Sequence, residues 1–161
     1  MKGIIVVSLA VVCFFAICTR GTLHASCKIY WTWALDCSEV NNLIVMQIKK
    51  WSTDTCKDGG EKCLYMLKEV SDDQIKATHE TPKHHYFDDL TFTFKTNGSE
   101  LCSVEGYSTS EIWYAVLDFG TNYCNLHNLI TGAGLDKAAK YTEETSDKIC
   151  TQYSSHNCDK Y

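Results

Sequence analysis

The most regular alternation of apolar and polar residues lies in the middle of the chain, at residues 90–95. Apolar Leu90, Phe92 and Phe94 alternate with polar Thr91, Thr93 and Lys95. This period of two is typical of a β-strand that buries one face and exposes the other. We therefore predict a strand here, with its phenylalanines in the core.

The residues directly after this strand, Asn97-Gly98-Ser99, predict a hairpin. A two-residue turn would place polar residues of the returning strand opposite the phenylalanines. A three-residue loop over 97–99 instead pairs Phe94 with Cys102 and Phe92 with Val104. Because strand register follows the buried face, we expect the three-residue loop.

A pattern with the period of a helix spans residues 37–51. One helical face collects the apolar residues Val40, Leu43, Ile44, Ile48 and Trp51. Asp36 and Glu39 have the spacing of a capping box, in which Asp36 is the cap. We predict an amphipathic helix over 37–51. A β-strand is the alternative, because Val45 and Met46 do not fit the apolar stripe.

The remaining sequence predicts short strands joined by turns. Further strands are expected at residues 27–37, 63–67, 74–78, 112–117 and 123–130. Residues 112–117 are apolar at almost every position, which is typical of a central strand covered on both faces. The Ser- and Thr-rich residues 106–110 predict a turn. The sum is an antiparallel α+β domain with one N-terminal helix and about six strands, with a β-barrel as the alternative.

The N-terminus has the pattern of a secretory signal peptide. A positive start is followed by an apolar run over residues 4–18 and by small residues. This run is shorter than the roughly 20 apolar residues of a membrane span, so an uncleaved anchor is the weaker alternative. Cleavage fits after Cys18 or after Ala25, and we favour Ala25. We expect a signal peptide over 1–25 and a single secreted domain without a membrane span over 26–161.

Charge restricts the classes of partner. The formal net charge is -5, and removal of residues 1–25 takes away Lys2 and Arg20. The 13 remaining basic residues (15 less 2) face 20 acidic ones, which gives about -7 and leaves no arginine. An acidic domain without arginine is unsuited to nucleic acid and lacks a polybasic patch for anionic lipid. We therefore expect a small apolar molecule or an extracellular protein as the partner.

Cysteines predict a disulfide framework. Of the ten, the eight outside the signal segment are Cys27, Cys37, Cys56, Cys63, Cys102, Cys124, Cys150 and Cys158. An even number in a secreted chain predicts four disulfides, whose pairing the sequence leaves open. Cys102–Cys124 is the single pair that we favour, because both residues fall in neighbouring predicted strands. A zinc site would need close CxxC pairs, which this sequence lacks.

Asn97-Gly98-Ser99 is also an acceptor for N-glycosylation. It falls at the predicted hairpin tip, where a glycan would reach solvent. We therefore list Asn97 as a candidate glycosylation site, with an unmodified turn as the alternative.

Two groups of residues are candidates for a metal site or a catalytic site. His79, His84 and His85 lie near carboxylates and include potential metal ligands, but they fall on an apparent exposed loop around Pro82. Cys124 lies near His127, yet the even cysteine count predicts that its sulfur is bonded. We therefore expect no catalytic residue, no metal and no cofactor, and we do not expect an enzyme.

Tyr30, Trp31 and Trp33 form the densest aromatic cluster. Tryptophan and tyrosine are frequent in binding hot spots, but they are also ordinary core residues of small domains. We consider all three as possible contacts to a ligand or partner, with the core as the alternative.

Residues 113–123, which end in Thr121-Asn122-Tyr123, resemble the late hairpin of lipocalins, where a Thr-Asp-Tyr triplet follows a strand. The early Gly-x-Trp motif of that family is absent. Lipocalins are secreted eight-stranded cups, so the resemblance implies carriage of a small apolar ligand. Residues 75–79, 89–94 and 150–155 also resemble small secreted Cys-rich animal proteins without an assigned activity, which implies a shared fold and secretion.

These observations favour a secreted binding protein for a small, partly apolar ligand. The alternative is a secreted protein-binding module of inhibitor, matrix or effector type without catalytic activity. A cavity with apolar walls favours the first, and an exposed apolar patch over a filled core favours the second.

Overall fold

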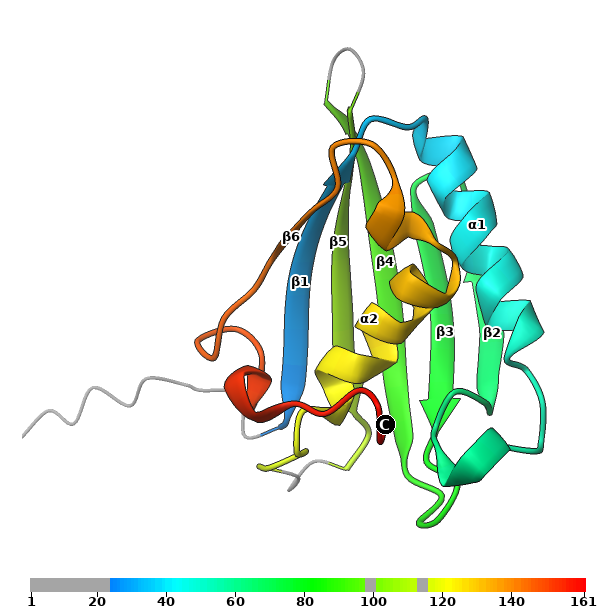
Figure 1. Ribbon diagram of the computed structural model, residues 1–161, viewed down its shortest axis with the longest axis vertical. Coiled ribbons are helices and arrows are strands. Elements are labelled where there is room, and N and C mark those ends of the chain that lie inside the picture. The colour runs from blue at the N-terminus through cyan, green and yellow to red at the C-terminus, as the bar shows by residue number, and fades with distance from the viewer. Residues whose placement is uncertain (1–23, 98–100, 113–115) are drawn as a thin grey trace, which may run out of the picture.

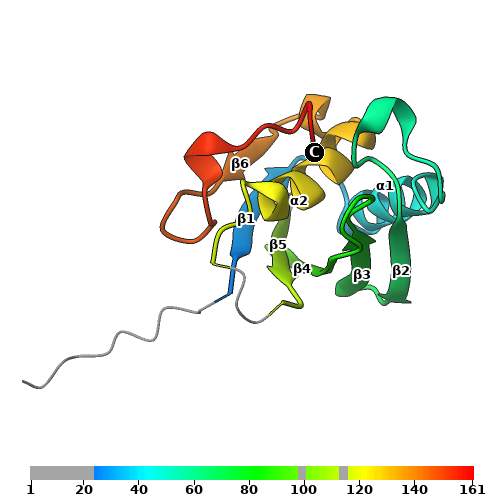
Figure 2. The same ribbon diagram turned by 90° about the horizontal axis from the view of Figure 1, so that it is seen from below.

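The computed structural model describes residues 24–97, 101–112 and 116–161 of the chain. Its strands are β1 (Ser26–Trp33), β2 (Tyr65–Val70), β3 (Gln74–Glu80), β4 (Phe87–Asn97), β5 (Leu101–Ser110) and β6 (Thr142–Glu144). Helices α1 (Cys37–Lys50) and α2 (Thr121–Gly132) both pack on one face of the sheet (Figure 1 and Figure 2). Single 3₁₀ turns occur at Lys57–Gly59, Leu135–Lys137 and Tyr153–Ser155. The fold is therefore of the α+β class.

The six strands form one antiparallel sheet in the order β2-β3-β4-β5-β1-β6. In the part of the chain that the structure describes, β2 and β6 are its edges. The sheet is thus open and does not close into the barrel that was the alternative. The first strand, β1, lies in its interior between β5 and β6.

The core lies between the sheet and the helices. Along β1 the inward residues Trp31 and Trp33 are fully buried, and the Trp31 ring stacks on Trp33 and on Phe92 with centroids 6.2 Å apart in each case. Gly106 on β5 leaves the space that this ring occupies, because a Cβ there would lie 2.4 Å from a Trp31 ring atom. A glycine within a strand often marks such a close approach.

Helix α1 begins after Asp36, at the position that the capping-box spacing indicates. The Asp36 side chain, however, makes no capping hydrogen bond to any described residue, so that part of the prediction is wrong. Val40, Ile44 and Ile48 are buried against the sheet, as their spacing requires. The helix ends one residue before the end of the predicted segment 37–51.

The largest difference from the sequence prediction is α2. Residues 123–130 were expected to form a strand, and they belong to this helix instead. A short apolar segment fits either period, and the polar contacts at its start favour the helix. The carboxylate of Asp118 accepts hydrogen bonds from the backbone N–H groups of Gly120 and Asn122, each at 3.1 Å.

Two further segments also differ. Residues 106–110, predicted as a turn, are the second half of β5. Residues 112–117 were predicted as a central strand, but Ile112, Val116 and Leu117 lie in neither a helix nor a strand. Residues 113–115 of that segment lie outside the described part of the chain. Val116 and Leu117 are more than half exposed, so the apolar run does not mark burial here.

The β4–β5 hairpin is antiparallel, but its register differs by two residues from the predicted one. Phe94 pairs with Val104 rather than with Cys102, and residues 98–100, which follow β4, lie outside the described part of the chain. A shift of two leaves every side chain on its own face, so the apolar pattern fits both registers equally. The observed register sets Gly106 beside the indole ring from β1, where a larger residue would clash.

The eight cysteines of the described residues form four disulfides, Cys27–Cys150, Cys37–Cys102, Cys56–Cys63 and Cys124–Cys158. The favoured Cys102–Cys124 pair is therefore wrong, because Cys124 lies on α2 and not on a strand beside Cys102. Two of the four bonds fasten the C-terminal segment to β1 and to α2.

Candidate ligand-binding site

A row of polar residues crosses four strands at one end of the sheet. Tyr65, His79, Asp88 and Ser110 are neighbours in register on β2, β3, β4 and β5, and we call them the polar row. All four are buried, and Asp88 is only 4 % exposed. Residues directly opposite on neighbouring strands project from the same face of a sheet, so the row lies on the core face, under the helix layer.

Helix α2 covers the polar row with asparagines. Asn125 donates from its Nδ2 to Asp88 Oδ2 at 2.7 Å, and its backbone carbonyl accepts from the Tyr65 hydroxyl at 3.1 Å. One turn earlier, Asn122 is fully buried and accepts a hydrogen bond from the Ser108 hydroxyl. The contact between α2 and this end of the sheet is thus polar, in contrast to the aromatic core further along.

The segment before α2 is held by the C-terminal part of the chain. Gln152 accepts hydrogen bonds through its Oε1 from the backbone N–H groups of Asp118, at 2.9 Å, and of Phe119, at 2.8 Å. Phe119 has φ +55°, a conformation that bulky residues rarely adopt. Its side chain is 64 % exposed, so these polar contacts and not core packing fix its position.

Burial shifts the pKa values of the polar row. It raises the pKa of Asp88 to about 6, against hydrogen bonds from Asn125 and Ser110 that favour the carboxylate. Burial lowers the pKa of His79 to about 4, so this imidazole is neutral at pH 7. Its Nε2 lies 2.8 Å from the backbone carbonyl oxygen of Glu61, which requires a proton on Nε2 and leaves Nδ1 as an acceptor.

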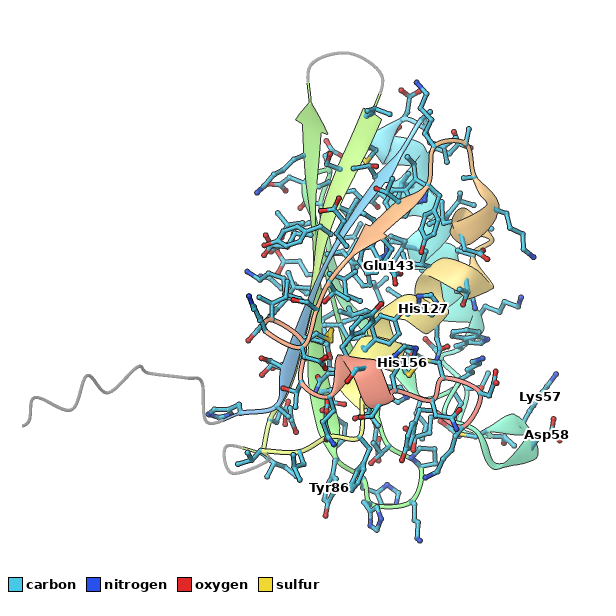
Figure 3. The ribbon with its side chains drawn as sticks, turned by 60° about the vertical axis from the view of Figure 1, so that its left-hand side comes forward. Lys57, Asp58, Tyr86, His127, Glu143 and His156 are labelled. Atoms are coloured by element: carbon cyan, nitrogen blue, oxygen red, sulfur yellow. A yellow bond between two sulfur atoms is a disulfide. The ribbon has the colours of Figure 1, made fainter. Side chains whose placement is uncertain are left out.

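A cavity of about 480 Å³ opens beside the polar row. It is lined by Glu61, Thr81, Lys83, His84, Tyr86, Asp88, Ser110, Ile112, Leu117, Asp118, Phe119, Thr121, Lys160 and Tyr161. Tyr86, one of these lining residues, lies at one end of the molecule (Figure 3). The volume of the cavity falls in the range of small-molecule sites, and its walls combine apolar side chains with a few polar groups.

The charges around the cavity are ordered by depth. Asp88 is buried, and Glu61 and Asp118 are half-buried. Lys83 and Lys160 also line the cavity, but both are exposed. Burial and the nearby charge of Asp88 raise the pKa of Glu61. The acidic groups thus lie deeper than the basic ones, where solvent screens them less.

One buried acceptor of this site has no donor. Among the described residues, three buried side-chain atoms lack a hydrogen-bond partner: Glu61 Oε2, His79 Nδ1 and Asp136 Oδ1. Of these three residues, Glu61 lines the cavity, whereas His79 lies behind it and bonds through its ring to the Glu61 backbone. A buried acceptor without a donor costs about 1–3 kcal/mol. The site therefore has room for a ligand that donates.

The three residue types of a serine hydrolase meet here in a different order. Asp88 lies between His79 and Ser110 across the strands, and Ser110 hydrogen-bonds to Asp88. In a catalytic triad the histidine stands between the other two, in contact with the serine. This arrangement is suited to binding polar groups and lacks the relay that activates a serine.

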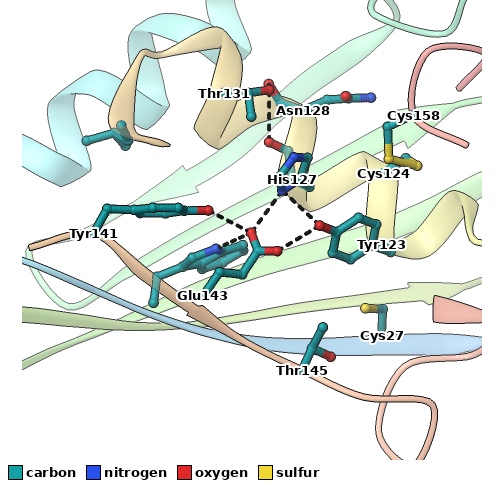
Figure 4. A network of polar contacts seen from close by, with 12 residues as sticks. Cys27, Tyr123, Cys124, His127, Asn128, Thr131, Tyr141, Glu143, Thr145 and Cys158 are labelled. Atoms are coloured by element: carbon teal, nitrogen blue, oxygen red, sulfur yellow. Dashed lines mark hydrogen bonds and ion pairs between the residues drawn. A yellow bond between two sulfur atoms is a disulfide. The ribbon is translucent and has the colours of Figure 1, made fainter. Parts of the chain in front are cut away.

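A second polar network lies around Glu143 on β6 (Figure 4). Its carboxylate accepts hydrogen bonds from Trp31 Nε1, the Tyr123 and Tyr141 hydroxyls and His127 Nδ1, at 2.7–2.9 Å. Burial alone would raise the pKa of Glu143, but these hydrogen bonds lower it to about 2. The network joins β6 to β1 and α2, so its evident role is to fasten the edge of the sheet.

The aromatic cluster predicted as a possible contact is divided by the sheet. Trp31 and Trp33 are fully buried in the core, and Trp33 donates from Nε1 to the Leu135 carbonyl at 2.9 Å. Tyr30 projects to the opposite, uncovered face and is 42 % exposed. None of the three lines the cavity beside the polar row, as the residues around it show.

The histidines considered as metal ligands lie in different environments. His79 is buried in the polar row, whereas His84 and His85 are exposed. His85 pairs with Glu80 at 2.6 Å. In the described residues, no three His, Cys, Asp or Glu side chains are placed to hold a metal ion.

The candidate glycosylation site lies at the far end of the hairpin. Asn97 is the last residue of β4, and Gly98 and Ser99 lie outside the described residues. Glycosylation at Asn97 stays a prediction.

Sequence reasoning did not single out Asp88 or Ser110 as residues of one site. The signal was present, because Asp88 continues the two-residue period of Leu90, Phe92 and Phe94. A polar residue at an inward position of a strand was the clue to this site.

Comparisons with known proteins add no family. No protein-family model matches the chain, and neither the curated proteins nor the solved structures gave a match. Neither helix among the described residues is long and apolar enough to cross a membrane.

Proposed function

We propose that this protein is a secreted carrier of a small, partly apolar ligand, bound in the cavity beside the polar row. The observation that carries this proposal is a cavity of about 480 Å³ with Ile112, Leu117 and Phe119 in its walls and the buried carboxyl group of Asp88 in its lining. A mostly apolar pocket with few placed polar groups is the usual form of a small-molecule site.

Secretion is part of this proposal. Four disulfides are consistent with an oxidising compartment outside the cell. The apolar run at residues 4–18 supports a signal peptide over 1–25, most of which lies outside the described residues.

The lipocalin resemblance supports carriage through its family's activity. The triplet that carries it, Thr121-Asn122-Tyr123, begins helix α2 in this structure. The proposal therefore depends on the cavity and not on a lipocalin cup.

A neutral apolar fluorophore tests the cavity directly. N-phenyl-1-naphthylamine should bind the oxidised protein saturably at one site, with a rise in its fluorescence. Leu117→Asn places a polar group in the cavity wall and should weaken binding at least fivefold. Val70→Asn changes a similarly exposed apolar residue on the β2 edge and should leave binding unchanged. Absence of saturable binding both of this fluorophore and of the three aromatic probes described below would refute the carrier.

A protein-binding module is the second candidate, and one observation favours it. Val116, Leu117 and Phe119 are each more than 60 % exposed in one short segment. Exposed apolar groups of this kind often mark a contact surface. If this is their role, Phe119→Ser should abolish binding of the protein partner. The fluorophore should then bind neither the wild type nor the Val70→Asn control.

A further inference from the structure

We infer that the ligand of this cavity is a small organic cation, a primary ammonium that carries an apolar or aromatic group. This inference rests on the proposed function, which supplies the cavity, and adds the chemistry that the cavity recognises. Three observations carry it: the depth of the charges, the unpaired acceptor Glu61 Oε2 and the aromatic walls.

The deep part of the cavity is acidic. Asp118 is occupied by the start of α2, where it accepts three hydrogen bonds from Gly120 and Asn122. Asp88 accepts hydrogen bonds from the uncharged side chains of Asn125 and Ser110, so its charge is not paired by them. Glu61 and Asp88 lie close enough for the charge of Asp88 to raise the pKa of Glu61. An anionic ligand would be repelled by both carboxyl groups, whereas a cation is attracted.

The unpaired acceptor of the lining selects a ligand that donates. Glu61 lines the cavity, and its Oε2 is buried and accepts no hydrogen bond from the described residues. A primary ammonium carries three donors and no acceptor. A neutral hydrocarbon would leave this acceptor unpaired, and its desolvation would count against binding of the hydrocarbon.

The walls suit the rest of such a ligand. Tyr86, Phe119 and Tyr161 contribute aromatic rings to the lining, and ring faces attract cations. The Lys160 ammonium lies 4.6 Å from the centroid of the Tyr161 ring and donates a hydrogen bond to its hydroxyl at 2.8 Å. Lys160 is exposed at the rim, so its charge opposes an incoming cation only weakly.

Three probes with one hydrocarbon body test the charge. Isothermal titration calorimetry at pH 7.5 compares 2-phenylethylammonium, 2-phenylethanol and 3-phenylpropanoate on the oxidised full domain. The cation should bind at least tenfold more tightly than the alcohol, and the carboxylate should bind weakest. An alcohol or carboxylate that equals the cation overturns the inference.

Two variants test whether Asp88 and Glu61 cause the preference for the cation. Asp88→Asn and Glu61→Gln should each weaken binding of the cation at least fivefold and change binding of the alcohol less than twofold. Asp89→Asn is the matched control, because it removes the same charge from the next residue, which is exposed on the opposite face of β4. Lys160→Gln should strengthen binding of the cation.

The two proposals fail in different ways. If the fluorophore binds but the cation shows no preference, the carrier stands and the ammonium ligand is wrong. If the cation still binds more tightly than the alcohol to both Asp88→Asn and Glu61→Gln, and thermal melts show that both variants are folded, the assignment of the preference to Asp88 and Glu61 is wrong. If neither the fluorophore nor any of the three probes binds, the carrier itself is wrong.

Discussion

Asp88 and Glu143 are carboxyl groups largely withdrawn from water, and their surroundings shift their pKa values in opposite directions. Asp88 has a pKa of about 6, mainly because of burial. Glu143 has a pKa of about 2, because four donors surround it and outweigh its burial. The charge on Asp88 therefore opposes folding, and the charge on Glu143 stabilises the fold.

Replacing Asp88 by asparagine should stabilise the protein at neutral pH. The folded pKa of about 6 exceeds the ordinary value of 3.8, so the folded state binds more protons between these pH values and stability falls as pH rises through them. Asp88→Asn removes this loss and should raise the free energy of unfolding by roughly 1–3 kcal/mol at pH 7.5. Urea unfolding should show the gap closing toward pH 4. A variant less stable than wild type at pH 7.5 would contradict this account.

Replacing Glu143 by glutamine should have the opposite effect. The folded pKa of about 2 lies below the ordinary 4.5, so the carboxylate stabilises the fold above pH 4.5 and this contribution is lost as pH falls toward 2. Glu143→Gln should lower the free energy of unfolding by about 2–3 kcal/mol at pH 7, with a smaller difference at pH 3. Glu144→Gln, its exposed neighbour on β6, should change stability by less than about 0.5 kcal/mol. Equal losses in the two variants would show that the hydrogen bonds of Glu143 do not matter.

At the scale of elements, the spacing of apolar residues predicted one strand and one helix correctly. The alternation at 90–95 and the helical stripe at 37–51 correspond to β4 and α1. Segment 123–130 was misassigned because a short apolar segment fits both periods. The hydrogen bonds that Asp118 accepts from Gly120 and Asn122 at the start of α2 are local polar contacts, which the apolar pattern does not contain.

The apolar pattern did not predict the polar row, for a related reason. An apolar pattern identifies the buried face only where that face is apolar, and Asp88 continues the period of β4 with a carboxyl group. Its neighbours His79 and Ser110 come from other strands, so their meeting depends on register. Register is fixed here by contacts such as that of Gly106 with Trp31, which no single strand reveals.

This contact predicts that Gly106 tolerates no side chain. A Cβ at Gly106 would lie 2.4 Å and 2.7 Å from atoms of the fully buried Trp31 ring. Gly106→Ala should therefore lower the free energy of unfolding by about 1–3 kcal/mol, measured by urea unfolding. Gly60→Ala is the control, since its Cβ would meet one backbone oxygen at 3.5 Å, and it should change stability by less than about 0.5 kcal/mol. An unchanged Gly106→Ala variant would mean that the ring moves aside at little cost.

At the scale of the whole molecule, the disulfides hold distant parts of the chain together. Cys27–Cys150 joins residues 123 positions apart, whereas Cys56–Cys63 spans 7. Closing a long loop restricts the unfolded chain more than closing a short one.

The two bonds should therefore differ in their contribution to stability. The double variant Cys27→Ala/Cys150→Ala should lose about 4–5 kcal/mol, and Cys56→Ala/Cys63→Ala about 2 kcal/mol, as measured by urea unfolding. Each pair serves as the control for the other. Equal losses would show that loop length does not decide the contribution of these bonds.

The interior position of β1 has a consequence for biosynthesis. Both partners of this strand, β5 and β6, come much later in the chain, and Trp33 also bonds to Leu135. While the chain leaves the ribosome, the two tryptophans of β1 lack the neighbouring strands β5 and β6, and Cys27 has no disulfide partner until Cys150 follows. The side of the sheet that holds β1 and β6 is thus completed last, and its long-range pairings predict slow refolding of the reduced chain that a disulfide isomerase accelerates.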